Sequence, residues 1–132
     1  MTSRKVSDVM NQSYPQVPAE ITLQQVVDSH ILSSGQRSFV VARGDELVGL
    51  LTLHRIKEIR RADWPTTTVA KAMIPAAQVK RIEPDAGLWG ALKEMDADGV
   101  SQLPVMADGH VVGMLTREGV IGFLRTMQEL QS

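Results

Sequence analysis

Two threonines are the first candidates for chemistry, because each ends an apolar, glycine-bearing segment directly before a stretch with helical periodicity. They are Thr52 in Gly49-Leu50-Leu51-Thr52 and Thr116 in Gly113-Met114-Leu115-Thr116. A threonine in this place can cap the helix by accepting a hydrogen bond from a free backbone N–H. The same N–H groups, the hydroxyl and the positive end of the helix dipole can also hold a phosphate. Both interpretations stay open, and the recurrence of the pattern favours a shared role.

Arg55 is the second candidate, one helical turn after Thr52. The nearby cations Lys57, Arg60 and Arg61 favour a solvated face near a helix end. A guanidinium at position 55 could instead bind a phosphate or the carboxylate of a partner. The sequence does not choose between these roles.

The remaining reactive residue types give no catalytic or metal site. His30, His54 and His110 fall on a predicted helix, a helix start and a hairpin, with no spacing that gathers them as ligands. His30 shares the apolar face of its helix, so we expect a core or partly buried side chain. The absence of cysteine excludes thiolate chemistry and disulfides. Without paired carboxylates, an activated nucleophile or a metal cluster, we expect no enzyme.

The amino-acid composition limits the classes of partner that we expect. The 132 residues, 43% of them hydrophobic, suit one compact domain. The net charge of -1, from 14 basic and 15 acidic residues, gives no global reason to expect binding to nucleic acid or to an anionic membrane. The apolar stretches are far shorter than the roughly 20 residues of a membrane helix. We therefore expect a cytoplasmic protein with no direct membrane insertion.

The candidate residues belong to two copies of one unit. Val6–Met10 aligns with Val69–Met73 at an offset of 63 residues, and the two Gly-x-x-Thr segments align at 64. Between them, two sets of residues at i, i+3, i+4 and i+7 predict a helix with one buried face in each copy, aligned at an offset of 65. These sets are Leu23, Val26, Val27 and His30, and Leu88, Ala91, Leu92 and Met95. We assign the drift of one or two residues to loops.

Each copy predicts the same order of elements. A short lead helix ending near its methionine is followed by a short strand, around Gln16-Val17 or from Gln78 to Ile82, and by the amphipathic helix. Two hairpin strands and a closing helix complete the copy, and the turns Arg43-Gly44-Asp45 and Ala107-Asp108-Gly109 supply residues that tolerate positive φ. The predicted hairpin strands run from Ser38 to Val41, Glu46 to Thr52, Gln102 to Met106 and His110 to Thr116.

The predicted domain organisation follows from this duplication. Residues 1–62 form the first repeat, 63–68 an extended linker around Trp64-Pro65, and 69–132 the second repeat. One repeat alone has too small a core, so we expect an α+β fold in which two βαββα-like repeats pack around a pseudo-two-fold axis.

The copies resemble CBS domains, which occur as tandem pairs (Bateman modules). The resemblance rests on the two Val-to-Met segments, Pro84-Asp85, Gly99–Val105 and the two Gly-x-x-Thr segments. It implies a regulatory pair that binds adenine nucleotides between its sheets. The family places an aspartate for the ribose hydroxyls three residues after the threonine, whereas this chain has Arg55 and Gly119 there.

The same resemblance implies two clefts, each combining the threonine of one copy with strands of the other. One uses Thr52, with Arg55 beside it, and Val79, Lys80, Leu103 and Pro104. The second uses Thr116 with Gln16, Val17, Phe39 and Val40.

A narrower resemblance is to the CBS pair of site-two-protease-like intramembrane zinc metallopeptidases. It rests on segments such as Val27–Leu32, Gly35–Phe39, Gly49–His54, Trp64–Val69 and Gly113–Glu118. It implies a regulatory appendage on the cytosolic side of a host catalytic domain. The chain itself lacks the catalytic His-Glu-x-x-His motif.

Two functions follow as hypotheses. In the first, the chain is a sensor that binds a small ligand, AMP, ADP or ATP, and controls an attached or partner protein. In the second, it is a ligandless homodimerisation module, a hypothesis favoured by the missing aspartates. The family implies a homodimer through the helices, and an outward-facing Trp89 would serve either that interface or the cover of the linker.

Overall fold

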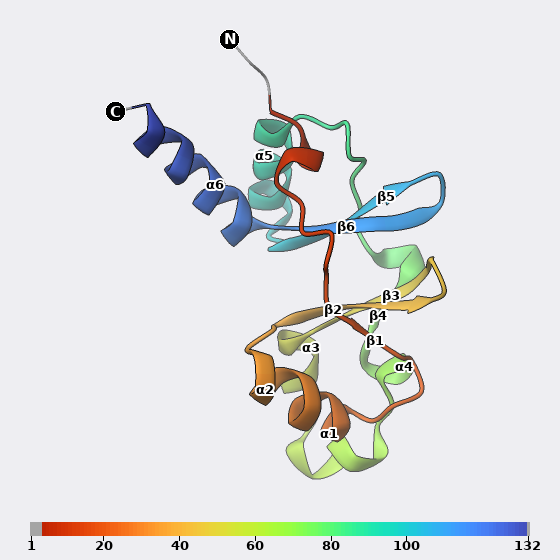
Figure 1. Cartoon of the computed structure of the whole chain (residues 1–132). Helices are drawn as coiled ribbons and strands as arrows, with labels where there is room; N and C mark the ends of the chain where they lie inside the picture. The colour runs from red at the N-terminus through yellow and green to blue at the C-terminus, as the bar shows by residue number, and fades with distance from the viewer. Residues whose placement is uncertain (1–3, 132) are drawn as a thin grey trace. The chain divides into compact units, whose positions relative to one another are not determined.

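The structure, a computed structural model, describes residues 4–131, and these divide into two compact units. The continuous unit is Tyr14–Val79, and the discontinuous unit combines residues 4–13 with residues 80–131. Each unit has two layers, with helices on one face of a small sheet (Figure 1). The fold is therefore α+β, as the sequence predicted.

The continuous unit contains a four-stranded sheet in the order β1-β2-β3-β4. Strand β1 is parallel to β2, whereas β2 with β3 and β3 with β4 are antiparallel. The strands are β1 (Gln16–Val17), β2 (Ser38–Arg43), β3 (Glu46–Thr52) and β4 (Ile74–Pro75). The α-helices are α1 (Leu23–Val26), α2 (Leu32–Ser34), α3 (Leu53–Lys57) and α4 (Val69–Ala72), with a π turn at Val27–Ile31 and 3-10 turns at Arg61–Thr66 and Ala76–Gln78.

The discontinuous unit repeats this plan around one hairpin. Ile82 forms a parallel bridge with Val105 on one side of the hairpin, and Asn11 forms an antiparallel bridge with Met114 on the other. These bridges stand where β1 and β4 flank the hairpin of the continuous unit. The elements are a 3-10 turn (Val6–Asp8), α5 (Leu88–Asp98), β5 (Gln102–Ala107), β6 (His110–Thr116) and α6 (Arg117–Leu130).

Each unit has its own apolar core between sheet and helices. In the continuous unit the core includes Leu23, Val26, Phe39, Leu51, Ile56 and Val69. In the discontinuous unit it includes Val6, Leu88, Met95, Leu103, Leu115 and Val120. The predicted periodic residues of both amphipathic helices therefore do face a core.

The lead segments, residues 5–11 and 68–75, each pack in the unit that holds the hairpin of the other repeat. The first is held in the discontinuous unit, where Val6 N donates to Ala86 O (2.9 Å) and the Val6 side chain is fully buried. The second is held in the continuous unit, where Val69 N donates to Ile21 O (2.8 Å). The repeats predicted at 1–62 and 69–132 describe the duplication and stay a prediction, since the compact units divide the chain differently.

The amphipathic helix of the first repeat is one residue longer than that of the second. Leu23 to Gly35 is twelve steps, whereas Leu88 to Gly99 is eleven. The π turn Val27–Ile31 absorbs the extra residue, so this one-residue step of the drift that we assigned to loops lies inside a helix.

The π turn also changes the alignment of His30. The N–H of Gly35 bonds to the carbonyl of Ile31 (2.8 Å), just as the N–H of Gly99 bonds to that of Met95. Ile31, rather than His30, is therefore the equivalent of Met95. His30 is partly buried, as expected, with its ring centroid 5.9 Å from that of Phe39 in an edge-to-face arrangement.

Two further local predictions were wrong. The linker is not extended, because Arg61–Thr66 forms a 3-10 helix. Trp64 stabilises this turn by donating its indole N–H to the carbonyls of Ile56 (3.2 Å) and Ile59 (3.0 Å). The strand expected from Gln78 to Ile82 is reduced to the single bridge at Ile82, and Gln78 ends a 3-10 turn.

Candidate functional site

Both candidate threonines are helix N-caps. The Thr52 hydroxyl accepts a hydrogen bond from the Arg55 N–H (3.2 Å) at the start of α3, and the Thr116 hydroxyl accepts one from the Gly119 N–H (3.0 Å) at the start of α6. This confirms the capping role. A phosphate-binding role for either residue stays a prediction.

The glycines of the two Gly-x-x-Thr segments serve a different purpose, the close approach of the lead segments. A Cβ at Gly49 would lie 2.5 Å from Met73 Sδ and 2.6 Å from Ile74 O. A Cβ at Gly113 would lie 2.8 Å from Met10 Sδ. Such distances are far inside van der Waals contact, so only glycine fits both strands. Each Gly-x-x-Thr segment therefore has two roles: its glycine lets the lead segment pack closely, and its threonine caps the following helix.

Arg55 is engaged by the end of the second lead segment. Its Nε donates to Ala72 O (3.0 Å) and its Nη2 to Met73 O (3.5 Å). Its Nη1 lies 3.8 Å from Glu58 Oε1, and the side chain is 40% exposed. Carbonyls at a helix end lack intrahelical donors, so the guanidinium supplies the bonds that α4 cannot make itself. Two of the N–H groups that could bind a phosphate are thus already used.

In the part of the second repeat that the structure describes, this arrangement has no counterpart. Gly119 occupies the position of Arg55, and a Cβ placed there would meet only the Thr116 hydroxyl, at 2.9 Å. The neighbouring Arg117 points its Nε at Asp96 Oδ1 (2.8 Å) in a half-exposed ion pair. Thr116 itself is partly exposed, whereas Thr52 is only 7% exposed. The two copies of the candidate site therefore differ in access and in charge.

The other predicted ligand-binding residues are mostly buried strand residues. Gln16 and Lys80 are exposed, and Lys80 Nζ lies 3.3 Å from Asp98 Oδ2. Gln16 is the register partner of Val40 across β1 and β2. The buried members are Val17, Phe39, Val40, Val79, Leu103 and Pro104.

Each predicted cleft draws on both compact units. The continuous unit contributes Thr52, Arg55, Val79, Gln16, Val17, Phe39 and Val40, and the discontinuous unit contributes Lys80, Leu103, Pro104 and Thr116. Phe39 and Leu103 belong to the cores, so their side chains serve packing. The clefts themselves stay a prediction.

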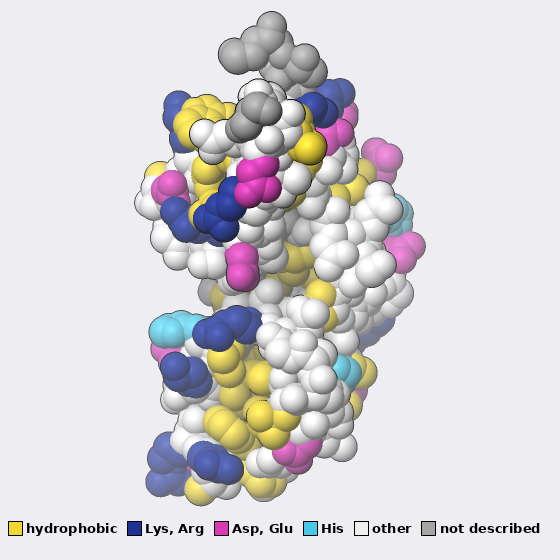
Figure 2. Space-filling model, turned by 60° about the vertical axis from the view of Figure 1, so that its left-hand side comes forward, with side chains coloured by type: hydrophobic (Ala, Val, Ile, Leu, Met, Phe, Trp, Pro, Cys, Tyr) yellow, Lys and Arg dark blue, Asp and Glu magenta, His cyan; other side chains and the backbone are white. Residues whose placement is uncertain are grey.

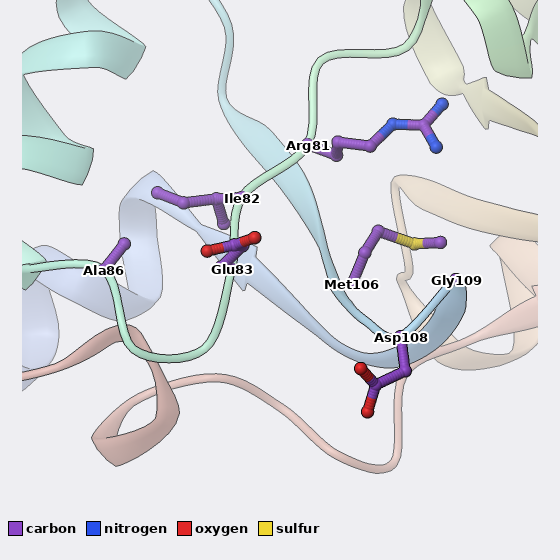
Figure 3. A pocket seen from close by; sticks show the side chains of 7 residues that line it. All are labelled: Arg81, Ile82, Glu83, Ala86, Met106, Asp108 and Gly109. Carbon is purple, nitrogen blue, oxygen red and sulfur yellow. The ribbon is translucent and has the colours of Figure 1, made fainter.

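A pocket that sequence reasoning missed lies within the discontinuous unit (Figure 3). Its cavity of about 440 Å³ is bounded by the segment that follows Lys80 and by the end of the β5–β6 hairpin. It is lined by Arg81, Ile82, Glu83, Ala86, Met106, Asp108 and Gly109. The turn at Asp108-Gly109 was predicted, but nothing in the sequence pattern joins it to Arg81 and Glu83.

Apolar side chains are also exposed on the helices. Trp89 on α5 is 63% exposed and Leu130 on α6 is 76% exposed, so the condition set for Trp89 as an interface residue is met. In the continuous unit Leu32 is 75% exposed. Figure 2 shows hydrophobic side chains gathered on one face of this unit, with Lys and Arg side chains beside them.

The described chain gives no further group of reactive side chains. Among residues 4–131, no three His, Asp or Glu side chains lie together as metal ligands would, and none of the helices is long and apolar enough to span a membrane.

Burial, and next the negative charge of Asp45, raises the pKa of Tyr14 above its usual value of 10.0.

Comparison with known proteins gives the same duplication. The family model named CBS domain matches residues 6–61 and again residues 69–126. A protein named zinc metalloprotease sll0528, from Synechocystis, is 25% identical over 129 residues. That match covers 96% of this chain and 34% of the relative, so the chain spans about a third of the relative's length.

Solved structures share the fold. The CBS domain pair of protein MJ0100, in complex with 5′-methylthioadenosine and S-adenosyl-L-methionine, superposes with a TM-score of 0.78 at 19% identity, covering 96% of this chain and 99% of that one. CBSX2 in complex with AMP superposes with a TM-score of 0.79 at 20% identity, covering 94% and 98%. At this identity the likeness speaks for the fold alone.

Proposed function

Because the chain belongs to the CBS-domain family of regulatory modules, we propose that it binds an adenine nucleotide in a cleft between its two repeats. AMP, ADP and ATP are the first ligands to test, followed by S-adenosylmethionine. The observation that carries the proposal is the duplicated strand that ends in a capping threonine, at equivalent places in the two repeats. Support comes from the two solved CBS proteins of the same fold that hold AMP or adenosine-based sulfur compounds.

The proposed roles follow from the chemistry of the residues. A ligand in the first candidate cleft would place its phosphate on the Thr52 hydroxyl and its base against Val79, Lys80, Leu103 and Pro104. A ligand in the other would place them on Thr116 and against Gln16, Val17, Phe39 and Val40. Since several of these side chains are buried, we expect backbone contacts from those groups that are not already bonded. The N–H of Val40 donates to Pro15 O and Pro104 O accepts from the Ile82 N–H, so both are already in use. With Arg55 and Gly119 in place of carboxylates, we expect the base and phosphates to dominate the affinity over the ribose hydroxyls.

We extend the proposal to a host protein. The zinc metalloprotease relative is about three times as long as the matched region, which supports a role as the regulatory part of such a protease, on the cytosolic side of a membrane. Ligand occupancy would then control the attached catalytic domain. The exposed Trp89 and Leu130 support pairing of two copies through their helices.

A ligandless homodimerisation module is the alternative function. The observation in its favour is that neither repeat offers a carboxylate at position 55 or 119. In that case the paired helices would carry the function and the clefts would stay empty.

A thermal-shift series separates the two functions. At one hundred times its Kd a ligand adds about 2.7 kcal/mol to the free energy of unfolding, which raises Tm by several degrees. We expect a shift with at least one of ATP, ADP, AMP and S-adenosylmethionine, and a smaller one with CTP as the control for base recognition. The absence of any shift at millimolar concentration would contradict the nucleotide proposal. Light scattering tests the dimer, and a mass of 14.5 kDa at all concentrations would contradict it.

A further inference from the structure

We propose that the sites at Thr52 and Thr116 are unequal, and that the chain binds one ligand, through Thr116. At Thr52 the Arg55 side chain instead links α3 to α4, a contact that we call the Arg55 tie. This inference rests on the proposed function and assigns it to one of two otherwise equivalent places. It also gives Arg55 a role that the sequence left open.

The tie is visible in the contacts of the Arg55 guanidinium. Its bonds to Ala72 O and Met73 O join α3 to the end of α4, next to the point where Met73 packs on Gly49. Ala72 is only 4% exposed, so its carbonyl has little access to water as a substitute. A phosphate that recruited this guanidinium would leave both carbonyls without that partner, which makes the exchange unfavourable.

The exposure of the two threonines supports the same assignment. Thr52 is only 7% exposed, and the side chain of Arg55, one turn later, is directed to the carbonyls of Ala72 and Met73. In the second repeat Thr116 is partly exposed, and Gly119 presents no side chain. The space around Gly119 is open, since a Cβ there would meet no atom within 4 Å except the Thr116 hydroxyl. Arg117 does not replace Arg55, because its Nε faces Asp96.

Isothermal titration with ATP, and with AMP for comparison, tests the stoichiometry on the full chain. We expect one site per chain, and at least a tenfold greater loss of affinity in Thr116→Ala than in Thr52→Ala. Thr116→Ser keeps the hydroxyl and should retain the affinity. Two sites per chain, or a larger loss in Thr52→Ala, would overturn the inference and leave the proposed function standing. No binding of either nucleotide at millimolar concentration would overturn the proposed function and this assignment with it.

Hydrogen exchange tests the tie without any ligand. Arg55→Ala should speed exchange of the amides of residues 72–74 at least tenfold, because α4 loses its link to α3. Arg60→Ala removes the same charge from a side chain that is 80% exposed and bound to Asp63, so it should leave those amides unchanged. Equal protection in Arg55→Ala and wild type would refute the tie.

Discussion

Replacing Gly49 by alanine is the sharpest test of how the lead segments are held. The new Cβ would lie 2.5 Å from Met73 Sδ and 2.6 Å from Ile74 O. The sulfur can move, but the carbonyl belongs to β4, whose Ile74 and Pro75 pair with Leu50 and Gly49. Relief therefore requires β4 to shift away from β3. Overpacking of this kind costs about 1–3 kcal/mol, and we place Gly49→Ala at the upper end.

Gly113→Ala is the matched variant in the second repeat. There the Cβ would meet Met10 Sδ at 2.8 Å and Asn11 O only at 3.3 Å, so a flexible side chain can absorb most of the clash. We expect a loss near the lower end of the same range, about 1 kcal/mol. Gly122→Ala on α6 is the control, because no atom lies within 4 Å of its Cβ and alanine favours a helix by up to about 1 kcal/mol.

Urea unfolding followed by circular dichroism measures these differences. Met73→Ala loses apolar packing by itself, so the comparison is made in that background. There Gly49→Ala should still cost part of its loss, because the sulfur contact is gone and the carbonyl contact remains. In the Met10→Ala background, Gly113→Ala should cost almost nothing. If Gly49→Ala proved no more destabilising than Gly113→Ala, backbone contact with β4 would not be the reason for the glycine.

Three further predictions follow from single contacts. Thr52→Ala removes the cap of α3 and should lower the free energy of unfolding by about 1 kcal/mol in urea titration, whereas Thr52→Ser should restore it. Trp64→Phe removes the indole N–H from two carbonyls and should destabilise the continuous unit by about 1–2 kcal/mol, measured in the same way; no loss would make the 3-10 turn independent of that bond. Since the folded state raises the pKa of Tyr14 above 10.0, stability should be unaffected below that pH and fall as the pH rises through the folded-state pKa. Tyr14→Phe should flatten that fall in thermal unfolding from pH 8 to 11, and an unchanged slope would assign it to other groups.

The sequence predicted most of the local elements because their signals are local. The Gly/Asp turns place both hairpins, and the threonines that end β3 and β6 do cap the following helices. Helical spacing identified the buried face of each amphipathic helix. The extra residue before Gly35 could not be placed, since a π turn and a longer loop satisfy the same spacing.

The candidate site was less predictable because it depends on long-range contacts. Arg55 follows Thr52 closely in sequence, but its partners Ala72 and Met73 lie 17 and 18 residues away. The pattern of residue types therefore did not decide the role of Arg55. The prediction of an extended linker was wrong for a similar reason. Pro65 and its neighbours favour an extended chain, but the Trp64 indole N–H bonds to the preceding helical turn and stabilises a 3-10 helix instead.

The exchange of lead segments also sets an order of assembly during synthesis. The continuous unit is complete once Val79 has been made, whereas Val6 must wait for the strands and helices that follow residue 80. An early, fully buried valine thus stays without its final core until most of the chain has left the ribosome. The packing of Val6 into this core is a long-range step, and such steps are slow relative to local folding. A chain stalled before α5 would expose this segment, which makes it a natural point of attack for chaperones and proteases.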